Sequence, residues 1–346
     1  MNLNFHKLNS QMHPLDEAAM RLAKARWDGI AKPVGSLGQL EELIIRIAGI
    51  QHGEPNIDKR GVLVLCADNG VCRQGVASTP AEITAVMAGF IAQKRSSVCV
   101  MARCANADVI PVDMGMLSSV PESALLERRV AGGTADMTQG PAMTRAQAEQ
   151  AIETGIELVR SCKEQGYRIL ATGEMGIGNT TTSSAIASIL LSRDPYEMAG
   201  RGAGLSDEGL ERKISAIRRA IEVNQPDPEN ALDVLAKLGG FDIAGLCGVF
   251  LGGALYGVPI LIDGFISAVA ALAAVRLCPN AGAYLLPSHA SAEPAAKHVL
   301  DELRVLPILH ANMRLGEGTG AVALLPLLDM ALAVYRELMT FADIGM

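Results

Sequence analysis

The sequence predicts an α/β fold with a doubly wound parallel sheet. Short apolar runs, each ended by a polar or glycine-rich turn, occur at 61–71, 107–116, 167–181 and 258–265. A long helical pattern at 144–166 separates two of these runs. Strands that alternate with helices in this way are typical of a parallel sheet covered by helices on both faces.

The composition agrees with a protein of this class. The 346 residues are 49% hydrophobic and 19% charged, which gives a full-sized core and argues against extensive disorder. The net charge is −7 and basic residues form no run, so nucleic acid is not expected as a partner. A small anionic substrate stays open, because a local pocket can be positive on an acidic protein.

Both ends of the chain are predicted to be helical. Apolar residues form helical stripes through 15–30 and 36–51, and 320–341 returns to the same pattern. A Pro- and Gly-containing loop at 31–38 separates the first two, and Ser36 is placed to cap the second.

An uncharged stretch at 243–262 is long enough to suggest a membrane hairpin. Gly257 and Pro259 interrupt it, and 258–263 has the form of a short buried strand, so we expect buried elements and no membrane partner.

The seven cysteines include no C-x-x-C pair, and the first residues do not form a signal peptide. These features predict reduced thiols in the cytoplasm.

Polar loops follow the predicted strands. They carry Asp68 with Asn69, Asp113, Glu174 and Asp263. Because ligands of doubly wound sheets bind at the carboxyl ends of the strands, we expect these loops to contribute to one site.

The segment GEMGIGNT, at 173–180, is rich in glycine and precedes a predicted helix. Glycine lets the backbone approach a ligand, and free N–H groups at a helix start favour an anion. Asn179 stands where a P-loop has its lysine, so the segment predicts a site for a single phosphate rather than ATP hydrolysis. A tight structural turn is the alternative.

A second glycine-rich loop carries Gly200, Gly202 and Gly204 before another helix. It lacks dinucleotide spacing and fits a second amide-lined contact to a phosphate. Lys213 follows in that helix, and its spacing alone favours a solvated helix face.

Glu317 lies between two glycines at the start of the last predicted helix. A carboxylate near helix amides is suited to accept a proton, but it is also a common stabilising device at helix starts. Its position alone does not separate these two interpretations.

The segment 286–293 offers Ser288, His289, Ser291 and Glu293, but the chain has no G-x-S-x-G elbow, so a hydrolase is not favoured. The six histidines are scattered without an H-E-x-x-H motif, and no metal or other cofactor is predicted. We interpret His289 as a polar loop residue bonded to backbone.

With these segments in hand, the chain resembles the nicotinate-nucleotide–dimethylbenzimidazole phosphoribosyltransferase family along nearly its whole length. The segments that carry the resemblance are KPVGSLGQLE (32–41), ADNGV (67–71), VDMG (112–115), GEMGIGNTT (173–181), GRGAGL (200–205), LIDGFISAVAALAA (261–274) and RLGEGTGA (314–321).

The resemblance implies transfer of phosphoribose from nicotinate mononucleotide to a lower-ligand base in cobamide synthesis, with Glu317 as the general base. Glu174 and Lys213 match the family's other charged site residues. The implied nucleotide-binding residues are Glu174, Gly176, Gly178, Asn179, Thr180, Gly202, Gly204, Lys213, Asp263, Ser291 and Leu315.

The implied fold joins a Rossmann-like α/β domain, 58–314, to a small helical domain built from both termini, 1–57 with 315–346. The implied assembly is a homodimer in which the neighbour's small domain closes a shared active site.

The chain departs from the family pattern in the implied acceptor-base pocket, which comprises Ser78, Thr79, Val86 and Met175. Thr79 and Val86 stand where the family often has tyrosine and glutamine; Asn69 replaces a usual histidine, and GTAD at 133–136 replaces GTRN. We therefore predict altered base specificity, with adenine, other benzimidazoles or a phenolic acceptor open. Two further alternatives are another phosphoribosyl or nucleotide-binding enzyme and a non-catalytic partner subunit of a heteromer.

Overall fold

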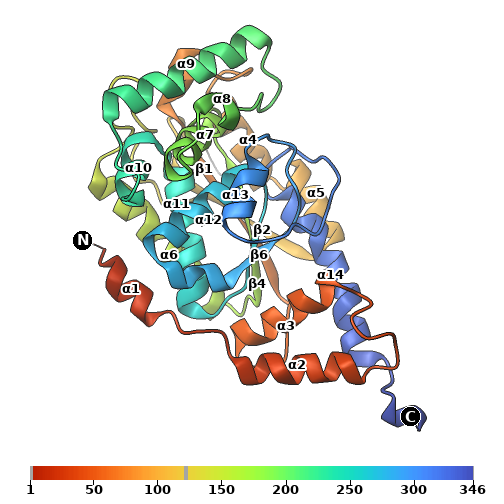
Figure 1. Ribbon diagram of the computed structural model, residues 1–346. Helices are drawn as coiled ribbons and strands as arrows, with labels where there is room; N and C mark the ends of the chain where they lie inside the picture. The colour runs from red at the N-terminus through yellow and green to blue at the C-terminus, as the bar shows by residue number, and fades with distance from the viewer. Residues whose placement is uncertain (1–2, 121–123, 346) are drawn as a thin grey trace.

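The computed structural model describes residues 3–120 and 124–345, and its centre is a parallel sheet with strand order β3-β2-β1-β4-β5-β6 (Figure 1). The strands are β1 (Arg60–Ala67), β2 (Ala107–Gly115), β3 (Leu126–Glu127), β4 (Ile169–Met175), β5 (Ile260–Ile262) and β6 (Leu285–Pro287). All neighbouring pairs are parallel, so the predicted doubly wound α/β sheet is confirmed. The order reverses between β1 and β4, which is where such sheets bind ligands.

The predicted strands correspond to β1, β2, β4 and β5, and every residue of β1 is buried. Such burial explains why β1 reads as a continuous apolar run rather than an alternating one. The sequence did not predict β3 and β6, which have two and three residues and therefore lack a detectable run.

Helices cover both faces of the sheet (Figure 1). The helices are α1 (Phe5–Gln11), α2 (Glu17–Gly29), α3 (Gln39–Gln51), α4 (Ile83–Ala92), α5 (Ser97–Cys104), α6 (Arg145–Glu164), α7 (Asn179–Leu190), α8 (Pro195–Met198), α9 (Asp207–Asn224), α10 (Ala231–Leu238), α11 (Phe241–Tyr256), α12 (Phe265–Leu277), α13 (Ala296–Glu302) and α14 (Thr319–Glu337). Helices α11 and α12 pack against one face, with α6 outside them, and α4, α5 and α14 pack against the other.

The uncharged stretch at 243–262 forms most of α11 and the strand β5 inside the protein. Helix α11 approaches α6 closely because glycines face each other: a Cβ at Gly155 would overlap the Gly245 carbonyl oxygen, and one at Gly248 would overlap the Ile152 carbonyl oxygen. This burial accounts for the lack of charge without a membrane. Among the described helices, α14 is long and apolar enough to cross a membrane, but a mostly buried core helix has the same composition.

The terminal segments meet at one end of the molecule, where α2, α3 and α14 lie together (Figure 1). The rings of Trp27 and Tyr335 pack edge to face with centroids 5.2 Å apart. Helix α1 instead lies against the 3-10 helix η2 (Pro279–Tyr284), where the Tyr284 hydroxyl donates to the His13 carbonyl oxygen at 2.7 Å. The division into 58–314 and 1–57 with 315–346 remains a prediction.

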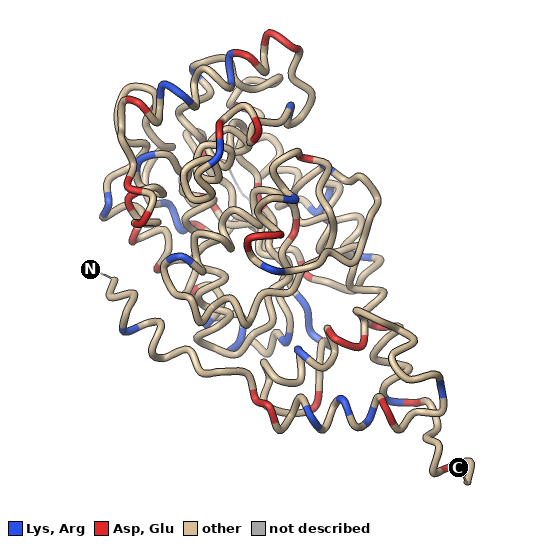
Figure 2. Tube along the Cα trace, viewed as in Figure 1, with Lys and Arg blue, Asp and Glu red and all other residues tan. Residues whose placement is uncertain are grey.

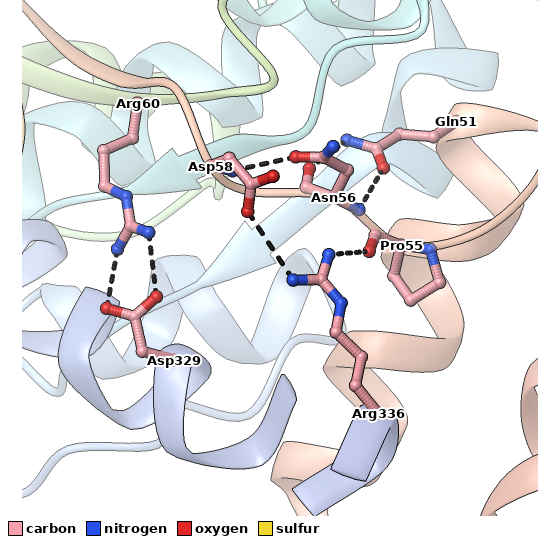
Figure 3. A network of polar contacts seen from close by, with 7 residues as sticks. All are labelled: Gln51, Pro55, Asn56, Asp58, Arg60, Asp329 and Arg336. Carbon is pink, nitrogen blue, oxygen red and sulfur yellow. Dashed lines mark hydrogen bonds and ion pairs between the residues drawn. The ribbon is translucent and has the colours of Figure 1, made fainter. Parts of the chain in front are cut away.

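Polar contacts attach α14 to the start of the sheet (Figure 3). The Arg60 guanidinium donates to both carboxylate oxygens of Asp329, each at 2.8 Å. Arg336 donates to the Pro55 carbonyl oxygen at 3.1 Å and lies 3.6 Å from the Asp58 carboxylate. These contacts fix the axis of α14, whose other end reaches the carboxyl edge of the sheet.

Charges on the surface are mixed in sign. Figure 2 shows Lys and Arg interspersed with Asp and Glu along the outer helices of the described chain, without a continuous basic stretch. The structure thus offers no extended surface for a phosphate backbone among the described residues.

Candidate active site

A cavity of about 180 Å³ lies at the carboxyl ends of β4 and β5. Most of the predicted nucleotide-binding residues line it, together with the predicted base-pocket residue Met175. The predicted residues along this cavity are Glu174, Met175, Gly176, Asn179, Thr180, Gly202, Asp263, Ser291 and Leu315. The glycine-rich loops at 174–180 and 200–205 therefore meet in space, as the phosphate hypothesis requires.

A smaller cavity of about 80 Å³ adjoins the first across the start of α7. It is lined by Ser78, Thr79 and Gly178, together with residues shared by both cavities. Val86 lines neither cavity and is 48% exposed on α4. The four predicted base-pocket residues thus do not line one cavity within a single chain.

Gly204, Lys213 and Glu317 also lie outside the walls of both cavities. Asp68 and Asp113 do not reach them either, because their carboxylates are used elsewhere. Asp68 accepts from the Leu117 amide at 2.7 Å, and Asp113 pairs with the Arg129 guanidinium at 2.7 Å. The expectation that all four polar loops contribute to one cavity is therefore wrong for Asp68 and Asp113, although the loop after β1 reaches the smaller cavity through Ser78 and Thr79.

The turn between β4 and α7 depends on glycine at two positions. Gly178 caps α7 in the left-handed region with φ +92°, and no side chain caps this helix. A Cβ at Gly176 would lie 2.5 Å from an Asp242 carboxylate oxygen. The turn therefore presents backbone to the cavities, and the uncapped start of α7 favours an anionic ligand.

Asp263, which follows β5, binds the start of α14. One of its carboxylate oxygens accepts from the Gly320 and Ala321 amides at 2.8 and 3.0 Å, and the other accepts from the Gly318 amide at 3.2 Å. Burial raises the pKa of Asp263, while the electrostatic interaction with His289 and the hydrogen bonds from the three amides act in the opposite sense. The cap of α14 is thus Asp263, and not Glu317.

Glu317 has a left-handed backbone with φ +61°, between Gly316 and Gly318, which also have positive φ. A non-glycine residue in this conformation is uncommon and costs free energy, so the surrounding contacts must hold it. The Glu317 side chain is buried, and its carboxylate accepts from the Val98 amide in the first turn of α5 at 3.1 Å. A Cβ at Gly173 would overlap the Glu317 carbonyl oxygen, so the segment lies directly on β4.

Lys213 is fully buried, so the solvated helix face favoured by its spacing is wrong. Its ammonium group donates to the Thr180 hydroxyl and to the Gly200 carbonyl oxygen, each at 2.9 Å. Burial lowers the pKa of Lys213 to about 8, and the charge of Glu293 acts in the opposite sense. Lys213 thereby connects the two glycine-rich loops beneath the cavities.

A buried carboxyl pair lies behind the turn. The side-chain amide of Asn179 donates to Glu174 at 2.5 Å and to Asp242 at 3.1 Å. Burial raises the pKa of Glu174 to about 8 and that of Asp242 to about 6. Sequence reasoning missed Asp242, although an acid at the start of an apolar helix in "GGFDIAGL" was a detectable signal.

His289 is buried at the wall of the larger cavity, and its ring Nδ1 lies 3.2 Å from the Ser288 hydroxyl. Its side chain therefore meets a neighbouring side chain, and the interpretation as a loop residue bonded to backbone is incomplete. Glu293 and Arg314, which the nucleotide-binding set did not include, also line this cavity.

Comparison with known proteins places this arrangement in a family. A family model described as phosphoribosyltransferase matches residues 12–346. The chain is 46% identical to the nicotinate-nucleotide–dimethylbenzimidazole phosphoribosyltransferase of Ruminiclostridium cellulolyticum, over 99% of this chain and 97% of that protein. The chain belongs to this family.

Other members agree. The phosphoribosyltransferase of the same name from Chloroflexus aggregans is 48% identical over 96% of this chain and 95% of its own length. The crystal structure of CobT from Thermus thermophilus superposes with a TM-score of 0.90 at 36% identity, covering 95% of this chain and 99% of that one. The predicted family resemblance is therefore confirmed, and so is the α/β fold that it implied.

Proposed function

We propose that this chain transfers the 5-phosphoribosyl group of nicotinate mononucleotide to a lower-ligand base, dimethylbenzimidazole or a related base, in the synthesis of the cobamide lower ligand. The proposal is carried by the near full-length match to nicotinate-nucleotide–dimethylbenzimidazole phosphoribosyltransferases, with a cavity lined by two glycine-rich loops at the carboxyl ends of β4 and β5. The products are nicotinate and an α-ribosyl 5′-phosphate.

In the proposed reaction, a ring nitrogen of the base attacks C1′ of the ribose. The bond from C1′ to the pyridinium nitrogen breaks, and its electron pair leaves with nicotinate. The second ring nitrogen of the base loses its proton to Glu317, which acts as the general base. The pyridinium is a good leaving group because it becomes neutral at that nitrogen on departure.

The phosphate is proposed to lie against the amides of Gly176, Gly178 and Gly202, whereas the Gly204 amide donates to the Arg201 carbonyl oxygen at 3.0 Å. Lys213 supports this site from below through the Thr180 hydroxyl: because that oxygen accepts from the ammonium, its own proton is free to be donated to a phosphate oxygen.

The acceptor base is proposed to bind between the 78–79 loop, α4 and the segment that ends at Glu317. Val86 and Leu315 leave this region exposed at 48% and 55% in the single chain. A second copy of the chain that covers these side chains would complete the pocket, which supports the homodimer with a shared site.

The seven cysteines are all free, which agrees with the proposed cytoplasmic location.

The decisive experiment mixes the purified chain with nicotinate mononucleotide and dimethylbenzimidazole and identifies the product by chromatography and mass spectrometry. Glu317→Gln is expected to lower kcat by about 10²–10⁴-fold, the range for a lost general base. Binding of the mononucleotide, measured by calorimetry, should survive the change. A wild-type rate in the Gln variant would remove Glu317 from this role.

The acceptor is a separate question. Thr79 lines the smaller cavity where the family often has an aromatic side chain, and this supports a changed base preference. Competition among dimethylbenzimidazole, other benzimidazoles, adenine and a phenolic acceptor would measure it. Strong selection of dimethylbenzimidazole over every rival would contradict the altered specificity.

Activity of the chain alone also tests the heteromer alternative, because a non-catalytic partner subunit would show none. Light scattering gives the mass of the assembly.

A further inference from the structure

Asp242 is a fully buried carboxyl group with no part in the proposed reaction. It lies in the first turn of α11, and one of its oxygens accepts from the Ile243 amide at 3.0 Å. The other oxygen accepts from the Asn179 side-chain amide at 3.1 Å, and the same nitrogen donates to Glu174 at 2.5 Å. One amide group therefore bridges two carboxyl groups.

Glycines make this arrangement rigid. A Cβ at Gly176 would lie 2.5 Å from the Asp242 oxygen that accepts from Asn179, and a Cβ at Gly240 would overlap the oxygen that accepts from Ile243. Asp242 can therefore reach Asn179 only because these two positions have no side chain. Gly176, Asn179 and Glu174 all line the larger cavity, so Asp242 lies directly behind its wall.

We propose that Asp242 is a positioning residue for the transfer reaction: its charge, held beside Glu174 by the shared Asn179 amide, keeps Glu174 neutral and protonated at the cavity wall. The role of this proton in turnover rests on the proposed function, because it requires Glu174 to face the nucleotide.

Physical chemistry favours one proton on the pair near neutral pH. Burial is the main cause that raises the pKa of Glu174 to about 8, the charges of Asp242 and Asp263 add to it, and the Asn179 hydrogen bond opposes it. Burial raises the pKa of Asp242 only to about 6, because Asn179, Asn69 and backbone amides stabilise its charge. Between these values Asp242 is ionised and Glu174 is not.

Other ionisable groups surround Glu174 on every side. They are Cys66 on β1, Asp242 on α11, Asp263 after β5, His289 and Glu293 after β6, and Arg314 and Glu317 before α14. Among the acids, Asp242 is the one joined to Glu174 through a shared donor. Removing its charge is therefore the most direct way to change the protonation of Glu174.

A protonated Glu174 supplies a hydrogen-bond donor where an ionised one would repel the substrate. Nicotinate mononucleotide carries a phosphate and a carboxylate, and both present anionic oxygens. A carboxyl O–H at the wall can donate to such an oxygen, whereas a second buried carboxylate would leave an unpaired charge beside it.

The test is infrared difference spectroscopy of the unliganded, full-length protein during a pH titration. The carboxyl C=O band that titrates near pH 8 is assigned to Glu174 by its loss in Glu174→Gln. Asp242→Asn, which keeps the shape of the side chain, should lower the midpoint of that band by about one to two pH units. Asn179→Ala should raise it, because a donor to the ionised form is lost.

The exposed Asp227 gives the matched control, since Asp227→Asn should leave the band unchanged. An unchanged midpoint in folded Asp242→Asn, or no band that is lost in Glu174→Gln, would overturn the proposal. If Asp242→Asn does not fold, the upward shift in Asn179→Ala still tests the bridge, and its absence is then decisive.

Turnover gives a second measurement. The loss of kcat/KM at high pH should begin about one to two pH units lower in Asp242→Asn than in the wild type, a shift that a purely structural role would not cause. A chain without any transferase activity would contradict the proposed function, while the infrared titration would still decide the role of Asp242.

Discussion

Asp263→Asn tests how the start of α14 is held beside the site. The asparagine oxygen can keep the two bonds from the Gly320 and Ala321 amides. Its NH₂ group then takes the place of the oxygen that accepts from Gly318, so a donor faces a buried donor. Because Asp263 is only 4% exposed, little water is available to replace the lost bond.

The magnitude follows from these three bonds. A buried donor left without a partner costs about 1–3 kcal/mol, and the two remaining bonds lose their charge-assisted part, about 1 kcal/mol. Removal of a buried charge, whose burial raises the pKa of Asp263, offsets the second cost. We therefore expect the free energy of unfolding to fall by about 1–3 kcal/mol.

The single tryptophan reports the effect. Trp27 is buried against Tyr335 of α14, so its fluorescence during urea unfolding follows the helix that loses its cap. Asp16→Asn is the matched control: one oxygen of Asp16 caps α2 through the Ala18 and Ala19 amides, and asparagine keeps that oxygen. A stability loss in Asp263→Asn no larger than in the control would refute the reasoning.

Three further predictions concern stability. Asp329→Ala leaves the buried Arg60 guanidinium without its carboxylate, and the free energy of unfolding should fall by about 1–3 kcal/mol in urea titrations. Gly248→Ala places a methyl group against the backbone of α6 and should cost about 1–3 kcal/mol or more, whereas Gly282→Ala, with its nearest neighbours at 3.6 and 3.8 Å, should cost little. Glu174→Gln should gain stability relative to the wild type as pH rises from 5 to 8, because a pKa raised to about 8 makes the wild type lose stability over that interval.

Each has a clear contrary result. An unchanged midpoint for Asp329→Ala would show that water replaces the carboxylate. Equal stabilities of Gly248→Ala and Gly282→Ala would mean that α6 and α11 can move apart without a cost in free energy. If the stability difference between Glu174→Gln and the wild type does not vary with pH, the pKa of Glu174 is not raised in the folded protein.

The sequence predicted the sheet where strands are long and buried. The eight residues of β1 form an apolar run because both faces are covered, and the same holds for β4. Leu126 and Glu127 of β3 are exposed and only extend the edge, so no pattern marks them.

The site was predictable where backbone chemistry decides it. Glycines at 176 and 178 predicted a close backbone approach, and the structure places both at cavity walls. The local spacing of Lys213 favours a solvated helix face, which is wrong. Lys213 shares a helical stripe with Ile217, Ala220 and Asn224, and this stripe is buried throughout. That stripe was a usable signal.

The partner of Glu317 was not predictable in the same way. The Val98 amide that binds its carboxylate lies 219 residues earlier in the chain, and no local pattern joins the two. The bridge from Glu174 to Asp242 is hidden for the same reason, since the two contacts depend on where α5 and α11 begin relative to the sheet. Contacts between distant segments require the fold itself.

The pairing of α14 with the N-terminal helices sets an order of events during synthesis. Trp27 is translated before the sheet, but α14, the helix that covers it, is translated only after the last described strand, β6. A growing chain must therefore carry an uncovered apolar face while the whole sheet is made, when domains begin to fold and exposed surfaces aggregate. We therefore expect the nascent chain to depend on chaperones, and products that stop before residue 319 to be degraded rapidly.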